Sequence, residues 1–414
     1  MPSSRRRFLA GSGLVVGAGV GYWQRRRIVR YPEIEELRAA FEISVPPVET
    51  GPAVSDDHLE ASYERARDVL EASTAAVDGD WREHSPDDVP PEYEPDALAG
   101  ASEVERRDAL ESLRGVIARA ASAVGEYCYE TGDLDRNDIR ERREAEHVAL
   151  AEFDPPYRGE SLTEAVVANA VSDRLRSSAR GGLEYVADNP PSDDWEYGSR
   201  WRRLERAAAT RHDAEWFVRD RAGADRADRL ESLLTDALER TEALEESIDV
   251  SHGDGEMSYV VDLYRREVMT TPGATPIESH LRRGYLARGL QRASYRYTYL
   301  EILEAFADIP SRAEWESLDW TVDAADVPAR KREAVETIEN ALERHGDDPL
   351  ARWLLASPVD TLERADDTLE RRIEDANDAD GEQWQRSINE YAVDCLEART
   401  FAAQVPDTVS ALLE

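Results

Sequence analysis

Arginines and tyrosines gather in one segment of the chain, residues 279–300, which contains no acidic residue. Guanidinium groups can hold carboxylates or phosphates through paired hydrogen bonds, and tyrosines add hydroxyl donors. Arg288, Arg292 and Arg296 recur every four residues, so they share one face of a helix. The sequence therefore predicts a candidate anion-binding set that consists of Arg282, Arg283, Arg288, Arg292, Arg296, Tyr295 and Tyr299.

A second interpretation of this segment stays open. The chain is rich in acids, so carboxylates on neighbouring helices can pair with each arginine and make the segment an ordinary central helix. Gly284 and Gly289 permit close packing, and His280 lies in the first turn of the same expected helix. The pairing of these arginines therefore decides between a ligand site and a structural helix.

The two cysteines, Cys128 and Cys395, each continue an apolar helical seam. A free thiol in such a place behaves as a small apolar group. In an exported protein the two thiols could instead form a disulfide that ties the halves of the chain together. Neither has a basic residue or a histidine placed to activate it, so we expect no nucleophile.

No pattern in the sequence predicts a catalytic centre. Glu144-x-x-His147 is one half of the paired motif of helical di-iron proteins, and the second half is missing. With 88 acids in 414 residues, spaced acidic pairs arise by chance. The chain has no P-loop, no G-x-G-x-x-G and no G-x-S-x-G. We therefore assign no catalytic residue, no metal ligand and no cofactor.

The charge of the chain indicates its solvent. Acidic residues outnumber basic ones by 88 to 51, and the formal net charge is −37. Such a chain is a poor partner for nucleic acid phosphates. Its self-repulsion is removed in molar salt, where the Debye length falls to about 3 Å. Lys331 is the only lysine, and the composition resembles that of proteins from extremely halophilic archaea.

The N-terminal residues carry a recognisable pattern. Residues 4–9 read Ser-Arg-Arg-Arg-Phe-Leu, and a mildly apolar, glycine-rich stretch follows up to Trp23. This pattern resembles the twin-arginine export signal, S-R-R-x-F-L. The residues that carry the resemblance are Ser4, Arg5, Arg6, Phe8 and Leu9. The resemblance implies that the twin-arginine export machinery moves the folded protein across the cell membrane.

The fate of this segment after export depends on its length. The apolar stretch is shorter than the roughly 20 residues that span a bilayer comfortably. No cysteine follows for lipid attachment, and no good A-x-A cleavage site is visible. We expect residues 1–30 to attach the protein to the cell membrane, uncleaved or cleaved late, with the remainder outside the cell. Arginines flank the stretch on both sides, so a cytoplasm-facing protein is the alternative.

Helical periodicity dominates the chain after residue 55, and Ser102-x-x-Glu105 is a capping box that marks the start of a helix. The sequence predicts an all-α, multi-helix bundle of about twelve helices. They include a central helix over residues 276–308 and two separate helices over residues 349–356 and 358–377. The expected divisions are 1–30 as signal or anchor, 31–55 as a short helix and proline-rich linker, 56–250 as a helical bundle, and 256–414 as a second bundle or a continuation of the first. Residues 251–255 are the expected junction.

These observations favour an exported, membrane-associated protein that binds a partner protein or a small anionic ligand without catalysis. A helical-toroid carbohydrate-active hydrolase is the alternative from another class. A pocket lined by tryptophan and tyrosine, with two carboxylates about 5–10 Å apart, would favour the hydrolase. A closed bundle whose arginines are all paired would favour a scaffold.

Overall fold

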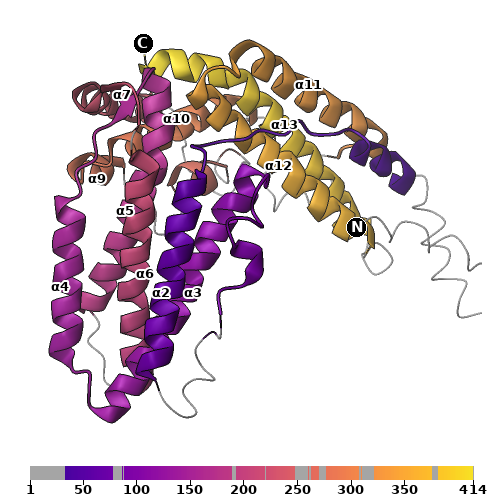
Figure 1. Cartoon of the computed structure of the whole chain (residues 1–414). Helices are drawn as coiled ribbons and strands as arrows, with labels where there is room; N and C mark the ends of the chain where they lie inside the picture. The colour runs from indigo at the N-terminus through magenta and orange to yellow at the C-terminus, as the bar shows by residue number, and fades with distance from the viewer. Residues whose placement is uncertain are drawn as a thin grey trace, which may run out of the picture.

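The structure is a computed structural model that describes residues 33–77, 86, 88–188, 193–219, 221–247, 260, 263–269, 277–306, 309, 321–374 and 381–413. Within these residues the protein is an all-α structure of twelve helices, which confirms the predicted fold class. The strands of the described part are β1 (Arg158–Gly159) and β2 (Ala224–Asp225), which pair antiparallel. The helices form two bundles, which we call the lower and the upper bundle from their places in Figure 1.

The lower bundle consists of long helices that lie side by side (Figure 1). They are α2 (Asp56–Ala76), α3 (Glu103–Thr131), α4 (Arg136–Glu152), α5 (Leu162–Asp188) and α6 (Asp194–Val218), with the short η2 (Pro91–Tyr93) before α3. Ser102 begins α3 with a reciprocal capping box to Glu105. Three small apolar clusters fill this bundle, so its core is divided among several helix contacts.

The upper bundle lies across the top of the lower one (Figure 1). It consists of α7 (Ala227–Ser247), α9 (Ile277–Arg282), α10 (Leu286–Ile302), α11 (Val327–His345), α12 (Pro349–Glu374) and α13 (Gly381–Leu413). Short turns named η3 (Tyr264–Met269), η4 (Leu303–Phe306) and η6 (Ala324–Asp326) join them, and η3 is a π-helix. One large apolar cluster holds these helices together, and α10 also packs on α5 of the lower bundle.

An N-terminal segment connects the two bundles. A helix over residues 33–41 inserts Leu37 and Ala40 into the upper core, and the Trp384 indole donates to the Glu33 carboxylate at 2.7 Å. Residues 42–54 then cross to the lower bundle as an extended strap, visible in indigo in Figure 1. Arg106 and Arg107 of α3 donate to its backbone oxygens, and one of these bonds, from Arg107 to Pro52, measures 2.9 Å.

Two helices differ from the sequence prediction. The predicted helix over 276–308 is broken after Arg282, because Gly284 takes a left-handed φ of +68° that ends α9. In contrast, α12 continues through Pro358, although an internal proline costs a helix about 3 kcal/mol. Leu354, Leu355 and Val359 on either side of this proline are buried in the upper core, and their packing keeps the helix intact.

Several sequence predictions concern residues that the structure does not describe. The export-signal residues Ser4, Arg5, Arg6, Phe8 and Leu9 lie outside the described residues, as does the expected junction at 251–255. In the part of the chain that is described, no helix combines the length and apolar character needed to cross a bilayer.

Candidate functional site

The break between α9 and α10 places the arginine-rich segment at the contact between the two bundles. The backbone turns at Gly284, and the Tyr285 N–H donates to the His280 carbonyl at 2.9 Å. Gly289 then allows α7 to approach, because a Cβ at this position would lie 2.5 Å from the Leu234 Cδ2 atom and 3.4 Å from the His280 Cβ atom. The turn and this glycine together hold His280 against α10.

Asp173 of α5 anchors the beginning of α10. Its buried carboxylate accepts from the backbone N–H of Ala287 at 3.1 Å and of Arg288 at 3.2 Å, and from the Tyr157 hydroxyl at 2.9 Å. Arg176 also donates to it at 3.2 Å. Burial raises the pKa of Asp173 to about 6, and these donors offset the burial only in part. The helix N-terminus is therefore already occupied by a carboxylate of the chain.

Aromatic rings hold two further guanidinium groups beside this carboxylate. Arg176 lies 5.4 Å from the centre of the Phe153 ring and 5.2 Å from that of Tyr285, and Arg180 lies 5.5 Å from the Tyr285 ring. Such contacts stabilise a cation through the ring face. The Tyr285 hydroxyl is buried and has no partner among the described residues. The start of α10 thus carries more cations than the single Asp173 carboxylate can neutralise.

Arg288 and Arg292 lie one turn apart on α10, half-buried, and their side chains have no acid partner among the described residues. Burial and the neighbouring charges of Arg292 and Arg174 lower the pKa of the Arg288 guanidinium to about 10. The Arg288 Nε–H is buried without an acceptor. The charge of Asp173 opposes the shift at Arg288, but within the described part of the chain neither arginine forms an ion pair with an acid.

His280 completes this group. Its side chain is 1% exposed, and its Nδ1 atom has no hydrogen-bond partner among the described residues. Burial, followed by the charges of Arg288, Arg292 and Arg283, lowers the pKa of His280 to about 4, so the ring is neutral at pH 7. We call His280, Arg288 and Arg292 the arginine–histidine site.

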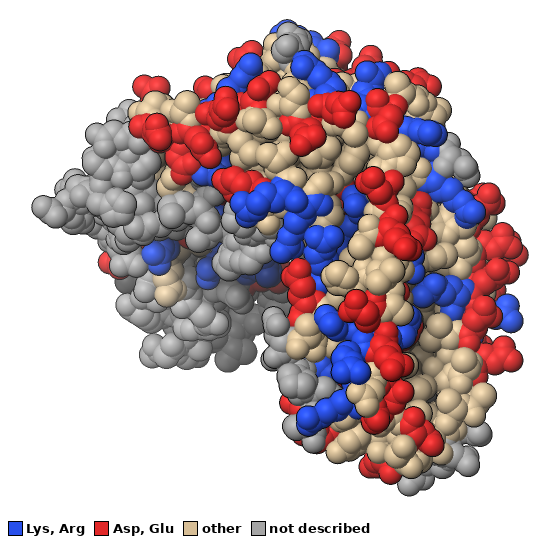
Figure 2. Space-filling view, turned by 90° about the vertical axis from the view of Figure 1, so that its left-hand side faces the viewer, with Lys and Arg blue, Asp and Glu red and all other residues tan. Residues whose placement is uncertain are grey.

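The surface around this contact is visible in Figure 2, which shows the side of the molecule where α4, α7 and α9 lie. Basic side chains gather at mid-height on this face, where the upper and lower helices meet. Acidic side chains dominate the surface above this basic area. A negatively charged ligand would therefore meet a local region of the opposite sign.

The second half of α10 is different, because Tyr295, Tyr299 and Arg296 each bind a carboxylate, although the Arg296 Nε atom has no partner among the described residues. Tyr295 donates to Glu267 at 2.8 Å, Tyr299 donates to Glu397 at 2.9 Å, and Arg296 pairs with Glu245. Burial and these carboxylates raise the pKa of Tyr295 to about 12. Among the predicted anion-binding residues, Arg296, Tyr295 and Tyr299 therefore belong to a paired network and not to the arginine–histidine site.

The remaining predicted residues lie near the turn. Arg282 is exposed, and Arg283 approaches Glu184 of α5 at 3.7 Å. Sequence reasoning missed Asp173 and Arg176, which position the site from more than a hundred residues away. No local pattern marks them, because the contact between α5 and α10 exists only in the folded chain.

Both cysteines are free thiols. Cys128 lies half-buried in α3 of the lower bundle, and Cys395 is buried in α13 of the upper bundle, so the alternative of a disulfide between them is not formed. Burial raises the pKa of the Cys395 thiol, and so does the charge of Asp394. A protonated, buried thiol is a poor nucleophile.

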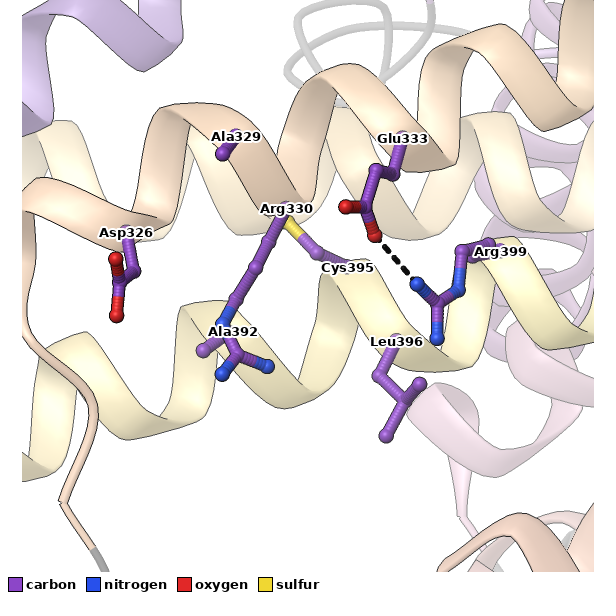
Figure 3. A pocket seen from close by; sticks show the side chains of 8 residues that line it. All are labelled: Asp326, Ala329, Arg330, Glu333, Ala392, Cys395, Leu396 and Arg399. Atoms are coloured by element: carbon purple, nitrogen blue, oxygen red, sulfur yellow. Dashed lines mark hydrogen bonds and ion pairs between the residues drawn. The ribbon is translucent and has the colours of Figure 1, made fainter.

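A pocket of about 310 Å³ lies beside Cys395, between α11 and α13 (Figure 3). Arg399 of α13 points toward Glu333 of α11, with their atoms 2.5 Å apart, and Arg330 extends from α11 toward Ala392 of α13. Nearby, Lys331 is fully buried and donates to Asp366 at 2.6 Å, and the Tyr391 hydroxyl donates to the same carboxylate at 2.6 Å. Each polar group of this buried trio has a partner, so it is a structural cluster.

A larger cavity of about 540 Å³ lies where the strap crosses α12. Tyr295 and Trp353 contribute aromatic surface, and Asp360, Glu363 and Asp367 contribute carboxylates. Burial raises the pKa of Asp360, and Arg364 opposes this shift. Among the described residues, no group of three histidine, cysteine, aspartate or glutamate side chains could hold a metal ion.

The lower bundle holds one further buried polar cluster. Asp213 accepts from Ser62 at 3.0 Å, from His58 at 3.2 Å and from Arg114, and the Trp216 ring stacks on the His58 ring with centres 5.6 Å apart. Arg114 and His58 hold the pKa of Asp213 below its ordinary value against the effect of burial. This cluster is internally satisfied, unlike the arginine–histidine site.

Comparison with known proteins bears on the lower bundle. Residues 57–228 match the domain of unknown function DUF8262, and this segment runs from the start of α2 to the start of α7. Asp173 and Arg176 lie within the matched segment, whereas His280, Arg288 and Arg292 lie beyond it. The chain matches no curated protein and no solved structure.

Proposed function

We propose that the chain is an exported, membrane-attached protein of haloarchaeal type that binds a small anionic ligand outside the cell, without catalysis. The signal-like residues Ser4, Arg5, Arg6, Phe8 and Leu9 support the location. The acid-rich composition supports a salt-rich environment. On this account the export machinery and the cell membrane are partners of residues 1–30, and the ligand is a partner of the folded bundles.

One observation carries the ligand-binding part of the proposal. Arg288 and Arg292 are half-buried cations without an acid partner among the described residues, in a chain of net charge −37. A buried charge without compensation is costly, and a bound anion would supply the compensation. The aromatic contacts of Arg176 and the carboxylate of Asp173 hold the surrounding helices in place for such a ligand.

Binding is tested by isothermal titration calorimetry of the full chain with sulfate, in about 2 M potassium chloride, where long-range attraction is screened. The wild type should bind, and the double variant Arg288→Gln/Arg292→Gln should bind at least about tenfold more weakly, a loss of about 1.4 kcal/mol. Arg282→Gln is the matched control, because it removes an exposed arginine of the same segment. Equal losses in both variants would contradict the site.

Location is tested separately, in cells grown in high salt. Fractionation and protease treatment of intact cells should find the wild-type chain on the outer side of the membrane. Changing Arg5 and Arg6 to lysine should leave the protein inside the cell, whereas changing Arg25 and Arg26 to lysine should not. Unchanged location of the Arg5→Lys/Arg6→Lys variant would contradict export through the twin-arginine route.

A second candidate function rests on the 540 Å³ cavity. Its lining of Tyr295 and Trp353 with Asp360, Glu363 and Asp367 matches the combination of aromatic rings and carboxylates that a carbohydrate-active hydrolase requires. Its test is hydrolysis of soluble polysaccharides by the wild type, with Asp360→Asn and Glu363→Gln as inactive variants. Activity that these variants abolish would favour the hydrolase, and activity that survives in both would exclude this cavity as its site.

A further inference from the structure

The unpartnered polar atoms of the described residues concentrate around the start of α10. They include the Arg288 Nε, His280 Nδ1, Tyr285 hydroxyl and Arg176 Nε atoms, which are buried without a hydrogen-bond partner in the described part of the chain. Leaving a buried polar group unpaired costs about 1–3 kcal/mol. The arginine Nε–H and the tyrosine hydroxyl can donate hydrogen bonds, so a ligand with several acceptor oxygens would pair with these atoms.

The number of uncompensated charges indicates the charge of that ligand. Arg288 and Arg292 together carry two positive charges, while Asp173 is engaged by Arg176, Tyr157 and the backbone of α10. A dianion would neutralise both guanidinium groups, and a monoanion would leave one of them buried and unpaired. In molar chloride, charge alone gives little selectivity, because screening acts over about 3 Å. Directed hydrogen bonds to oxygen then distinguish an oxyanion from a halide.

His280 gives the site a dependence on pH. The charged groups that act on its ring are Arg283 in the turn and Arg288 and Arg292 on α10, and α7 presents the apolar Leu234 at the Gly289 contact. No carboxylate of the described residues acts on the ring. A dianion placed among these groups would cancel the positive charges of Arg288 and Arg292, and a negative neighbour raises the pKa of a histidine.

Resting on the proposed anion-binding function, we propose that the ligand is a small tetrahedral dianion, such as sulfate or a phosphate group, bound by Arg288, Arg292 and His280, and that His280 takes up one proton from solvent when it binds. The imidazole gains this proton and becomes an imidazolium, which then donates to the oxyanion from both ring nitrogens or from the one that faces it. No covalent bond forms or breaks. Arg288 and Arg292 balance the two charges of the dianion, and the imidazolium adds one positive charge that its hydrogen bond to the oxyanion stabilises.

Sulfate is the probe, because it keeps both charges between about pH 8 and about pH 5, the range into which the bound dianion should raise the pKa of His280. We expect the affinity of the wild type for sulfate to rise as the pH falls, by up to about tenfold per pH unit. Calorimetry in two buffers of different ionisation enthalpy should count about one proton taken up per sulfate at the acidic end. His280→Asn should take up fewer protons per sulfate than the wild type, and any uptake that remains belongs to Asp173, whose pKa is about 6.

Formate and nitrate test the charge of the ligand, and inorganic phosphate tests the second tetrahedral oxyanion. Both monoanions should bind at least about tenfold more weakly than sulfate. Monoanions that bind as well as sulfate would overturn the proposal that the ligand is a dianion, while anion binding itself would stand.

A pH-independent affinity of the wild type, with no proton uptake, would overturn the role of His280. If no anion binds at all, the proposed function fails. Proton counting on the wild type tests His280 even if His280→Asn does not fold.

Discussion

The two ends of α10 carry the same kinds of side chain in opposite states. At the C-terminal end, Arg296 pairs with Glu245 and Tyr299 donates to the buried Glu397. At the N-terminal end, Arg288 and Arg292 have no acid partner among the described residues, and His280 is buried and neutral beside them. Arginines at regular spacing on one helix face can therefore stabilise the fold at one end of the helix and remain available to a ligand at the other end.

The acids of neighbouring helices cause this difference. Glu245 comes from α7, Glu267 from η3 and Glu397 from α13, and all three reach the second half of α10. The first half meets α5, which supplies Asp173 together with Arg176 and Arg180, and these arginines add to the positive charge. Substituting one residue at each end of α10 tests this difference.

The largest effect should come from Glu397→Gln at the paired end. Glu397 is 3% exposed and accepts from the Arg266 guanidinium at 2.6 Å and from the Tyr299 hydroxyl at 2.9 Å. Loss of its charge weakens both of these charge-assisted hydrogen bonds, and together they cost about 3 kcal/mol although Arg266 keeps Glu267 at 2.7 Å. Urea unfolding in molar salt measures the change in the free energy of unfolding. A loss below about 0.5 kcal/mol would show that this network does not stabilise the fold.

Sulfate should produce the next largest effect, at the other end. At a concentration of about one hundred times its dissociation constant, a ligand of the folded state raises the free energy of unfolding by about 2.7 kcal/mol. The wild type and Glu397→Gln should both gain this stabilisation, because Glu397 belongs to the other network. Arg288→Gln/Arg292→Gln should gain almost none. Equal stabilisation of this double variant would mean that sulfate acts through the solvent alone.

A smaller effect separates the arginines themselves when no oxyanion is present. Arg288→Gln should leave the free energy of unfolding within about 0.5 kcal/mol of the wild type or raise it, because no ion pair is lost. Arg296→Gln should lower it by about 1 kcal/mol, because Glu245 loses a partly buried partner. The same urea titration compares the two variants. A larger loss for Arg288→Gln would reveal an acid partner at the first end.

The last comparison concerns pH. The pKa of His280 is about 4 in the folded protein and 6.5 ordinarily, so the unfolded chain binds more protons between these values. The contribution of His280 to stability is present above pH 6.5 and is lost as the pH falls toward 4. His212 shows the same shift, so the melting temperature of His280→Asn must be compared with that of the wild type. The variant should lose less on acidification, and an identical loss would contradict a neutral, buried His280.

Most of the helices could be predicted from the sequence, whereas the pairing of their side chains could not. Periodicity and the Ser102–Glu105 capping box predicted the all-α fold, because both are local properties of the chain. The same reasoning predicted one continuous helix in place of α9 and α10, because the positive φ of Gly284 is set by the folded structure and not by the local sequence. It also split α12 at Pro358, where core packing outweighs the local cost of proline.

For the candidate site, spacing correctly placed Arg288, Arg292 and Arg296 on one helix. It could not separate the paired arginine from the unpaired ones, because Glu245, the partner of Arg296, lies 51 residues away in the chain. His280 was visible in the sequence, whereas Asp173 and Arg176 were not. Electrostatic partners across helices depend on the tertiary arrangement, which a single sequence does not display.

The most direct test of this account compares two single variants that differ only in which end of α10 they alter. Sulfate affinity of the full chain is measured by calorimetry in molar potassium chloride for Arg292→Gln and Arg296→Gln. We expect a loss of at least about tenfold for Arg292→Gln and an unchanged affinity for Arg296→Gln. Equal affinities of the two variants would contradict the claim that the first end of α10 is an anion-binding site.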